Sequence, residues 1–404
     1  VGPDIGGRLH TGRSRNDLAS TVSRMATRER FISLADLLLD LQKMLITFSS
    51  NHIDTIMTGY TPLQPAQPTT LGHYLISVSQ AIERDSNRVL QAYPRLNLSP
   101  LGACAFAGTG FPIDRGLTAK LLGFTGIIES TTDAVASRDY VTEILAGIAS
   151  LGVTLSRLAQ DLYLWCSDEW STMEIANEAA ISSSIMPQKK NPVTLEIIKA
   201  KAAHLIGSLT ASLTVQKGLN FMHCHDMSHE SVDPIWDALT HAEIMIKLAI
   251  FTVSGLKINK GIMLNRTVEN FSTATELADL LVREKNLPFR TAHAIVGNVV
   301  SSAISQGVHA DGITVDMVYE SAMEVSGEPV LVTESQLASA LDPIQNLENK
   351  KASGSPSKRE TQRLIEITVA SIQQHQEKIQ SFKNEQAQAS AELDHMVAAI
   401  RFVP

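Results

Sequence analysis

Five long segments with a helical spacing of apolar residues dominate the sequence and limit the folds that it can adopt. In Asp17–Ser50, for example, leucines recur close to an i, i+3/i+4 pattern at positions 37, 38, 41 and 45. The other four segments are Thr70–Leu90, Ala134–Cys166, Pro192–Gln216 and Pro234–Leu256. Each exceeds the globular average of about three turns, and long helices pack side by side as bundles. The sequence therefore predicts an all-α fold with a long-helix bundle as its core.

Several of these segments are apolar on more than one face, as in Leu205–Val215 and Ile244–Val253. A helix that is apolar nearly all round is buried in a large core or in an oligomer interface. We therefore expect several copies of the chain to join their bundles.

The pattern of long helices ends near Leu256–Met263. Beyond this point the predicted helices are shorter, and residues typical of loops are frequent. A turn at Gly354–Ser357 precedes Lys358–Val397, which reads as a final amphipathic helix or pair of helices. We predict a central helical-bundle domain at residues 13–261 and a smaller C-terminal helical domain at residues 262–404. Residues 1–12 read as the remnant of a truncated N-terminal domain, because Val1–Leu9 resembles the middle of a segment.

The composition argues against several classes of partner. A net charge of −8 is unsuited to general nucleic-acid binding, which needs a basic surface. There is no apolar run of about 18 uncharged residues, the length that a membrane-spanning helix requires, and no signal peptide opens the chain. The cysteines, Cys104, Cys166 and Cys224, form no CxxC pair, which indicates a reducing compartment. We expect a cytoplasmic protein without nucleic-acid or membrane partners.

The segment Gly7–Asp17, GRLHTGRSRND, gathers basic side chains just before the first long helix. Asn16 or Asp17 is a candidate N-cap for that helix. Arg13 and Arg15 beside the free helix-end amides would bind a carboxylate through paired hydrogen bonds. The alternative is a solvated basic helix start, and spacing alone favours it.

The segment Gly59–Pro68, GYTPLQPAQP, contains prolines that forbid a regular helix and stiffen the backbone. A stiff loop is a good mount for Thr61 and Gln64. The alternative is a rigid connector between helices, which the segment by itself favours.

The segment Ile181–Asn191, ISSSIMPQKKN, places three serines ahead of two lysines and an amide, and Pro192 fits the first position of the following helix. A carbanion next to a carboxylate needs cations and donors where its charge develops, and Lys189 and Asn191 supply them. A neighbouring serine could act as an alkoxide if lysine and helix-end amides stabilised it. The alternative is a polar surface loop before a capped helix.

The segment Asn220–Asp233 holds His223, His225 and His229, of which the last two are spaced i, i+4. A metal site needs a third ligand that the segment does not offer, so we favour a role in lining a functional pocket and predict no metal.

Together and in this order, the four segments resemble the signature regions of the argininosuccinate lyase family within the aspartase/fumarase superfamily. SSIMPQKKNP at Ser183–Pro192 is similar to the superfamily's signature loop, and HTGRSRND at His10–Asp17 resembles the argininosuccinate lyase branch. Supporting matches are GYTPLQPAQP, LGACAFAGTGFPIDR at Leu101–Arg115, DAVASRDY at Asp133–Tyr140 and LPFRTAH at Leu287–His293.

The resemblance implies a carbon–nitrogen lyase that releases fumarate from an N-substituted aspartate by anti β-elimination, without a cofactor. It also implies a homotetramer with a twenty-helix core and four active sites, each shared by three subunits. At the matching positions, Ser183 would be the general base, Lys189 and Asn191 would stabilise the aci-carboxylate, and Glu196 would complete the catalytic set. The substrate-binding set that we expect comprises Ser14, Arg15, Asn16, Thr61, Gln64, Arg138, His223, Ser228 and Ser231, of which Arg15, Asn16 and Thr61 would hold the succinyl carboxylates.

Some positions depart from the family pattern. Pro62 replaces the histidine of GYTHLQ, which pairs in the family with a glutamate at the position of Glu196, so the proton donor is unassigned. Ser182 replaces the glycine before the catalytic serine, which restricts the loop's opening.

The largest departure lies in the fourth segment. The family pattern YNRDLQEDK binds the arginine portion through tyrosine, glutamine and lysine, and here His223, Ser228 and Ser231 replace them. A pocket built for other hydrogen bonds rejects the usual ligand, so we predict an amine other than arginine. Ethylenediamine-disuccinate lyase, a family member, suggests one candidate substrate. The alternatives are a genuine argininosuccinate lyase, a non-enzymatic relative like the lens δ-crystallins, and, as a weaker option, a metal-dependent hydrolase using His225 and His229.

Overall fold

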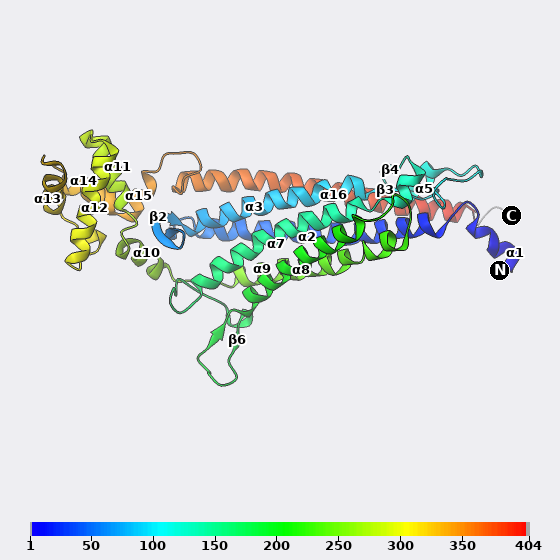
Figure 1. Cartoon of the computed structure of the whole chain (residues 1–404), viewed down its shortest axis with the longest axis horizontal. Coiled ribbons are helices and arrows are strands. Elements are labelled where there is room, and N and C mark those ends of the chain that lie inside the picture. Colours follow the sequence, from blue (N-terminus) through cyan, green and yellow to red (C-terminus); the bar gives the residue numbers. More distant parts are fainter. Residues whose placement is uncertain (1, 401–404) are drawn as a thin grey trace.

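The computed structural model describes residues 2–400 as an elongated bundle of long helices with a smaller helical unit at one end (Figure 1). The predicted all-α class and long-helix core are confirmed. The bundle consists of α2 (Arg15–Asn51), α3 (Leu71–Gln91), α7 (Asp139–Trp165), α8 (Val193–Gln216), α9 (Pro234–Ser254) and α16 (Lys358–Ile400).

Four of the five expected helices appear with their ends shifted by a few residues, whereas the segment Ala134–Cys166 is divided. The short helix α6 (Thr131–Ala136) ends before Ser137, which has extended backbone angles, and α7 begins two residues later. The Ser137 hydroxyl donates to the Asp133 carboxylate one turn back. Such local side-chain bonds compete with the helical backbone, which explains the break.

The bundle core is a continuous apolar cluster to which all six long helices contribute, with fully buried members such as Leu41, Leu145 and Leu239. Burying one side chain of this size contributes roughly 1.5–3 kcal/mol. By length and composition alone, α7 is apolar enough to cross a membrane, but 56% of its most apolar window is buried inside the bundle. Its apolar character is that of a core helix.

Helix α16 belongs to the bundle, although the sequence placed residues 358–404 in the C-terminal domain. It runs back along α2 and α3, and its Ile372, Ile379 and Phe382 enter the bundle core. Phe382 stacks on Tyr93 with ring centroids 3.6 Å apart. The apolar stripe of this segment predicted a helix, but it did not predict that the stripe packs against α2 and α3.

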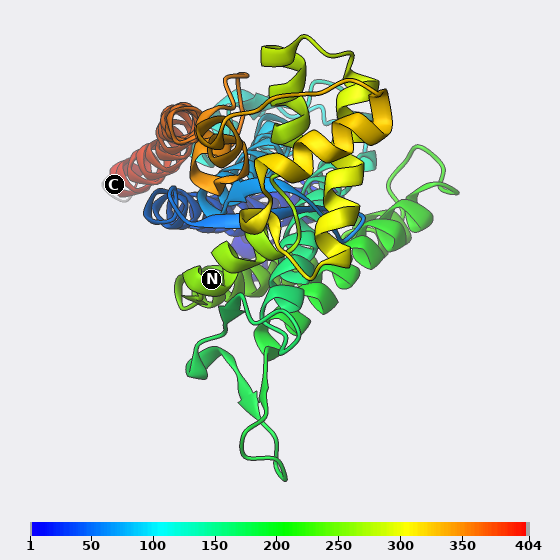
Figure 2. The same ribbon diagram turned by 90° about the vertical axis from the view of Figure 1, so that its left-hand side faces the viewer.

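The smaller unit has its own apolar core, formed by α11 (Ala274–Lys285), α12 (Phe289–Ser305), α13 (Val315–Ser326) and α14 (Glu334–Leu341). It faces the viewer in Figure 2. Helices α10 (Lys260–Glu269) and α15 (Pro343–Glu348) connect it to the bundle. The remaining short helices are α1 (Pro3–Gly6), η1 (Gly7–His10), α4 (Tyr93–Leu96), α5 (Arg115–Leu121), η2 (Asn177–Ala179), η3 (Asp226–Glu230) and η4 (Ala310–Gly312).

The strands within residues 2–400 form four two-stranded pairs at the ends of the bundle helices. Three pairs are antiparallel: β1 (Ile56–Thr61) with β2 (Gln64–Thr70), β5 (Met173–Glu174) with β8 (Lys257–Ile258), and β6 (Ile181–Ser182) with β7 (Lys190–Asn191). The parallel pair is β3 (Leu98–Ser99) with β4 (Gly126–Ile127).

Candidate active site

The predicted catalytic segment forms a β-hairpin that projects from the bundle (Figures 1 and 2). Strands β6 and β7 pair at its base. The Ser183 N–H donates to the Lys189 carbonyl over 3.3 Å, and the Asn191 side-chain amide donates to the Ile181 carbonyl over 3.1 Å. The hairpin thus brings Ser183, Lys189 and Asn191 together, as the sequence predicted.

The Ser183 hydroxyl oxygen accepts two backbone hydrogen bonds from within the hairpin. The donors are the N–H groups of Met186 at 3.2 Å and Ile185 at 3.4 Å. Hydrogen bonds of this kind strengthen when the oxygen becomes an anion, which favours the deprotonated form of the acceptor. The local fold therefore prepares this oxygen to carry negative charge.

A cavity of about 740 Å³ lies between this hairpin and the chain that follows α7. Its lining includes Lys189 and Asn191 from the hairpin and Tyr163 and Cys166 from the end of α7. Burial raises the pKa of the Cys166 thiol to about 12, so this thiol stays protonated at neutral pH.

The two consecutive lysines of the hairpin have different surroundings. Lys190 forms an ion pair with Glu174 at 2.7 Å, and Lys257 approaches the same carboxylate at 3.5 Å. The hydrogen bond from Lys190 is the main reason why the pKa of Glu174 lies below its ordinary value. Lys189, in contrast, is exposed on the hairpin. Its ammonium is therefore the lysine charge available to a ligand in the cavity.

Glu196 lies in the first turn of α8 and accepts a hydrogen bond from the Tyr163 hydroxyl at 3.1 Å. No local pattern in the sequence predicts this contact, because Tyr163 lies 33 residues earlier on another helix. Pro192 was expected at the first helical position, whereas α8 begins at Val193 and Pro192 directly precedes it.

Thr61 and Gln64 face each other across the turn of the β1–β2 hairpin, and both side chains are exposed. The sequence predicted a stiff loop here. An edge hairpin tolerates prolines because their missing N–H groups can face away from the partner strand, and the register shifts between Thr58 and Tyr60. Tyr60 packs on Trp170 with ring centroids 4.7 Å apart, so this hairpin lies near the end of α7.

The first site segment caps α2. Ser14, and not Asn16 or Asp17 as the sequence suggested, is the N-cap, and its hydroxyl accepts from the Asn16 N–H at 3.2 Å. Asp17 is fully buried and accepts backbone N–H bonds from Ser14, Gly102 and Cys104, each at 2.9 Å. Its carboxylate ties the loop around residue 103 to the start of α2, a role that the sequence analysis missed.

Arg13 and Arg15 are exposed beside this helix start. The Arg13 guanidinium donates to the Leu9 carbonyl. The Asn16 side chain donates to the Ala105 carbonyl at 3.0 Å, which fixes its amide. The arrangement offers the exposed Arg15 guanidinium at the positive end of the α2 dipole, which is consistent with a carboxylate site.

Arg138 is only 2% exposed, so the structure does not support a direct role in substrate binding within one chain. Its guanidinium donates to the carbonyls of Ser137 at 2.7 Å and Val135 at 3.4 Å. His223 lies in the same region, and its pKa is lowered, chiefly by burial and further by the positive charges of Arg138 and Arg15. His223 is therefore neutral at pH 7.

The predicted amine-pocket serines are engaged in local hydrogen bonds. Ser231 is fully buried and its hydroxyl donates to the Met227 carbonyl at 2.7 Å, so it does not face a pocket in this chain. The Ser228 hydroxyl donates to the His225 carbonyl at 3.2 Å. The rings of His225 and His229 lie 4.4 Å apart, but no group of three His, Cys, Asp or Glu side chains within residues 2–400 is arranged to hold a metal ion.

The predicted site residues therefore gather at two opposite ends of the bundle (Figure 1). One end holds the start of α2, Arg138 and the α8–α9 connection, and the other holds both hairpins and the cavity. Helix α7 joins the two ends, and its 27 residues span roughly 40 Å. A single chain cannot bring Arg15 and Ser183 to one substrate.

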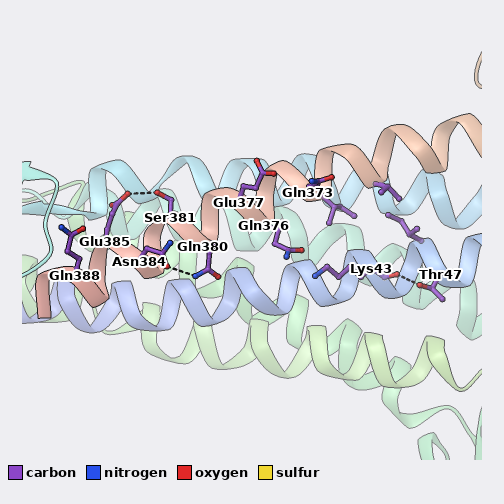
Figure 3. Close-up of a pocket in the computed structure, with 13 residues that line it drawn as sticks. Lys43, Thr47, Gln373, Gln376, Glu377, Gln380, Ser381, Asn384, Glu385 and Gln388 are labelled. Atoms are coloured by element: carbon purple, nitrogen blue, oxygen red, sulfur yellow. Dashed lines mark hydrogen bonds between the residues drawn. The ribbon is translucent and has the colours of Figure 1, made fainter. Parts of the chain in front are cut away.

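A second cavity, of about 880 Å³, runs along the outside of the bundle between α2 and α16 (Figure 3). Glutamine and other polar side chains of α16 line it, with Lys43 and Thr47 of α2 facing them. Although this groove is larger, it contains none of the predicted site residues. The cavity behind the hairpin of β6 and β7 is the better candidate because Lys189 and Asn191, two of the predicted catalytic residues, line it.

Comparison with known proteins places the chain in a family. Residues 2–207 match the family described as "Lyase", and residues 271–348 match "Argininosuccinate lyase C-terminal". Argininosuccinate lyase 1 of Shouchella clausii is 42% identical over 400 residues, covering 99% of this chain and 80% of that protein. Argininosuccinate lyase of Methanococcus aeolicus is 40% identical, covering 95% and 79%.

A solved structure extends this result to the fold. The crystal structure of EDDS lyase in complex with formate superposes with a TM-score of 0.94 at 34% identity, covering 98% of this chain and 79% of that one. With sequence families and fold in agreement, the chain belongs to the argininosuccinate lyase family of the aspartase/fumarase superfamily and is a carbon–nitrogen lyase.

Proposed function

We propose that the enzyme eliminates fumarate from an N-substituted L-aspartate, with Ser183 as the general base. The observation that carries this proposal is the pair of backbone N–H groups bonded to the Ser183 oxygen, next to the exposed Lys189. Two such donors and a nearby cation stabilise an alkoxide, which is a base strong enough to remove a proton from carbon.

In the proposed mechanism, Ser183 removes the proton from the carbon β to the departing nitrogen. Lys189 and Asn191 stabilise the aci-carboxylate that results, while Arg15, Asn16 and Thr61 hold the succinyl carboxylates. The electron pair then forms the carbon–carbon double bond of fumarate and the C–N bond breaks. No cofactor enters this scheme.

We propose that the active site is shared between copies of the chain in a homotetramer. The separation of roughly 40 Å between the two ends of α7 supports sharing, because antiparallel copies would bring opposite ends together. Exposed apolar side chains on the bundle helices also support it, among them Val153, Ile206 and Leu213. The reducing compartment indicated by the cysteines makes the cytoplasm the proposed location.

The proposed leaving amine is not arginine. The replacements at His223, Ser228 and Ser231 support this, since Ser231 is buried and His223 is neutral. The similarity to EDDS lyase makes an aminocarboxylate such as ethylenediamine-disuccinate one candidate. Argininosuccinate is the second candidate, favoured by the names of the relatives at 40–42% identity.

The test uses the reverse reaction and the Ser183→Ala variant. Fumarate is incubated with a panel of amines that includes arginine and ethylenediamine, and the loss of fumarate absorbance is followed. We expect turnover with a non-arginine amine and a loss of at least about a thousandfold in Ser183→Ala, because the base is removed. Ser182→Ala, which changes the neighbouring hydroxyl, is the matched control.

Preferred turnover of arginine would overturn the substrate proposal and leave the lyase assignment intact. Full activity of Ser183→Ala would overturn the role of Ser183. If no amine consumed fumarate, a scaffold without enzymatic activity, like that of the crystallins, would be the better description.

A further inference from the structure

Elimination leaves one role unfilled, namely the group that protonates the departing amine. When the substrate nitrogen reacts as the neutral amine, the C–N bonding electrons would leave it as an alkylamide anion, which is far too basic to depart without a proton. Pro62 occupies the family histidine position that pairs with the glutamate. A proton donor must therefore be sought among the side chains that line the cavity.

Most of the ionisable groups in this cavity are unsuited to give up a proton to the nitrogen. Cys166 has a pKa raised to about 12 by burial. Glu174 is held ionised by its ion pair with Lys190, which in turn fixes the Lys190 ammonium. Lys189 is assigned to the aci-carboxylate. The hydroxyls of Ser167 and Ser171 also line the cavity, but each donates to a backbone carbonyl and is much less acidic than a phenol. The best remaining proton donor in the lining is therefore the hydroxyl of Tyr163.

Tyr163 is held by side chains of α8 at both its hydroxyl and its ring. The hydroxyl donates to Glu196 at 3.1 Å, and the Lys199 ammonium lies 4.0 Å from the ring centroid. Lys199 is itself fixed by a bond of 3.1 Å to Gln160. Glu196 keeps the phenol protonated before reaction, and the cation over the ring stabilises the phenolate that proton transfer creates.

We propose that Tyr163 is the general acid that protonates the leaving amine. This inference rests on the proposed function. Ser183 takes the proton from carbon, the C–N electron pair moves to nitrogen, and nitrogen receives the phenolic proton. The products are fumarate, the neutral amine, the serine hydroxyl and a phenolate. Exchange with water then returns a proton to Tyr163 and removes one from Ser183, which closes the cycle.

The raised pKa of Tyr163, caused first by its hydrogen bond to Glu196, is consistent with this role. A phenol whose pKa lies above its usual value of 10 stays protonated at neutral pH.

The test compares Tyr163→Phe with wild type on N-substituted aspartates whose amines range from alkylamines to arylamines. The Phe variant keeps the ring against Lys199 and removes only the hydroxyl. We expect kcat/KM to fall about 10²–10⁴-fold with alkylamine leaving groups. With arylamines, whose departure depends less on proton transfer because their nitrogen is much less basic, we expect a loss of less than about tenfold.

The matched control is Tyr74→Phe. The Tyr74 hydroxyl donates to Asp161 of α7 at 2.7 Å, so this variant removes the same kind of phenol–carboxylate bond outside the cavity. We expect it to retain kcat/KM within about threefold for every leaving group, because most structural effects are independent of the amine.

An equal loss with alkylamines and arylamines, or no loss with either, would overturn the role of Tyr163. If wild type releases fumarate and Ser183→Ala does not, the proposed function stands whatever Tyr163→Phe does. If wild type acts on none of the series, the proposed function and this inference fall together.

Discussion

At the scale of single residues, the Asp17 carboxylate holds together the end of the bundle where Arg15 lies. It is fully buried and accepts three backbone N–H bonds. We expect Asp17→Ala to lower the free energy of unfolding by about 3 kcal/mol, because buried donors lose a charged acceptor. Urea unfolding measures this change.

Asp36→Ala is the matched control on the same helix. Asp36 pairs with Lys383 at 2.7 Å but is 42% exposed, and a pair of this kind contributes less than about 1 kcal/mol. Equal losses in the two variants would contradict the role given to Asp17.

At the scale of elements, helix α16 is attached to the bundle through a buried histidine. His375 is 7% exposed, and its Nε2 lies 2.8 Å from the Asn87 side-chain oxygen. Burial lowers the pKa of His375 below its ordinary value of 6.5, with Lys378 acting in the same direction and Glu83 against it. The folded state therefore favours the neutral imidazole.

The pH dependence of this contact follows from the direction in which the pKa of His375 is shifted. Above pH 6.5 the imidazole is neutral in both states, and the contact contributes its full stability. As the pH falls below 6.5, the unfolded state binds a proton that the folded state does not bind. The free energy of unfolding therefore falls by up to about 1.4 kcal/mol per pH unit until the pH drops below the pKa of the folded state.

We expect the amides of α16 near residue 375 to lose hydrogen-exchange protection between pH 7.5 and 5.5. A His375→Leu variant that kept the same pH dependence would refute this explanation.

At the scale of the whole molecule, the two clusters of site residues at opposite ends make activity a property of the assembly. Ser183→Ala and Arg15→Ala should each be inactive as pure proteins. When the two are co-expressed, we expect about a quarter of the sites to combine an intact Ser183 with an intact Arg15 from another copy. Fumarate release by the mixture, compared with each parent, measures this recovery.

A mixture as inactive as its parents would argue against shared sites. Ile206→Asp gives a control, because this side chain is 47% exposed near the middle of α8, between the two clusters. We expect it to shift the sedimentation coefficient towards the monomer and to lower activity together with the loss of assembly.

Helices were predictable wherever a pattern within one segment decided the structure. Apolar spacing located the long helices to within a few residues, and the motif around Ser183 predicted which polar groups come together. The break at Ser137 was missed, because it depends on a side-chain bond to Asp133 that competes with the helix. The hairpin at Thr61 was missed because its prolines indicate only that a helix is absent.

The sequence by itself determined the fold class, the family and the candidate catalytic segment around Ser183, because each depends on periodicity or on residues close together in the chain. Only the tertiary structure decided where α16 packs, that Arg138 and Ser231 are buried, and that Tyr163 meets Glu196. These features depend on which faces of distant helices come into contact. A helical pattern specifies that a face is apolar, but not which other face will cover it.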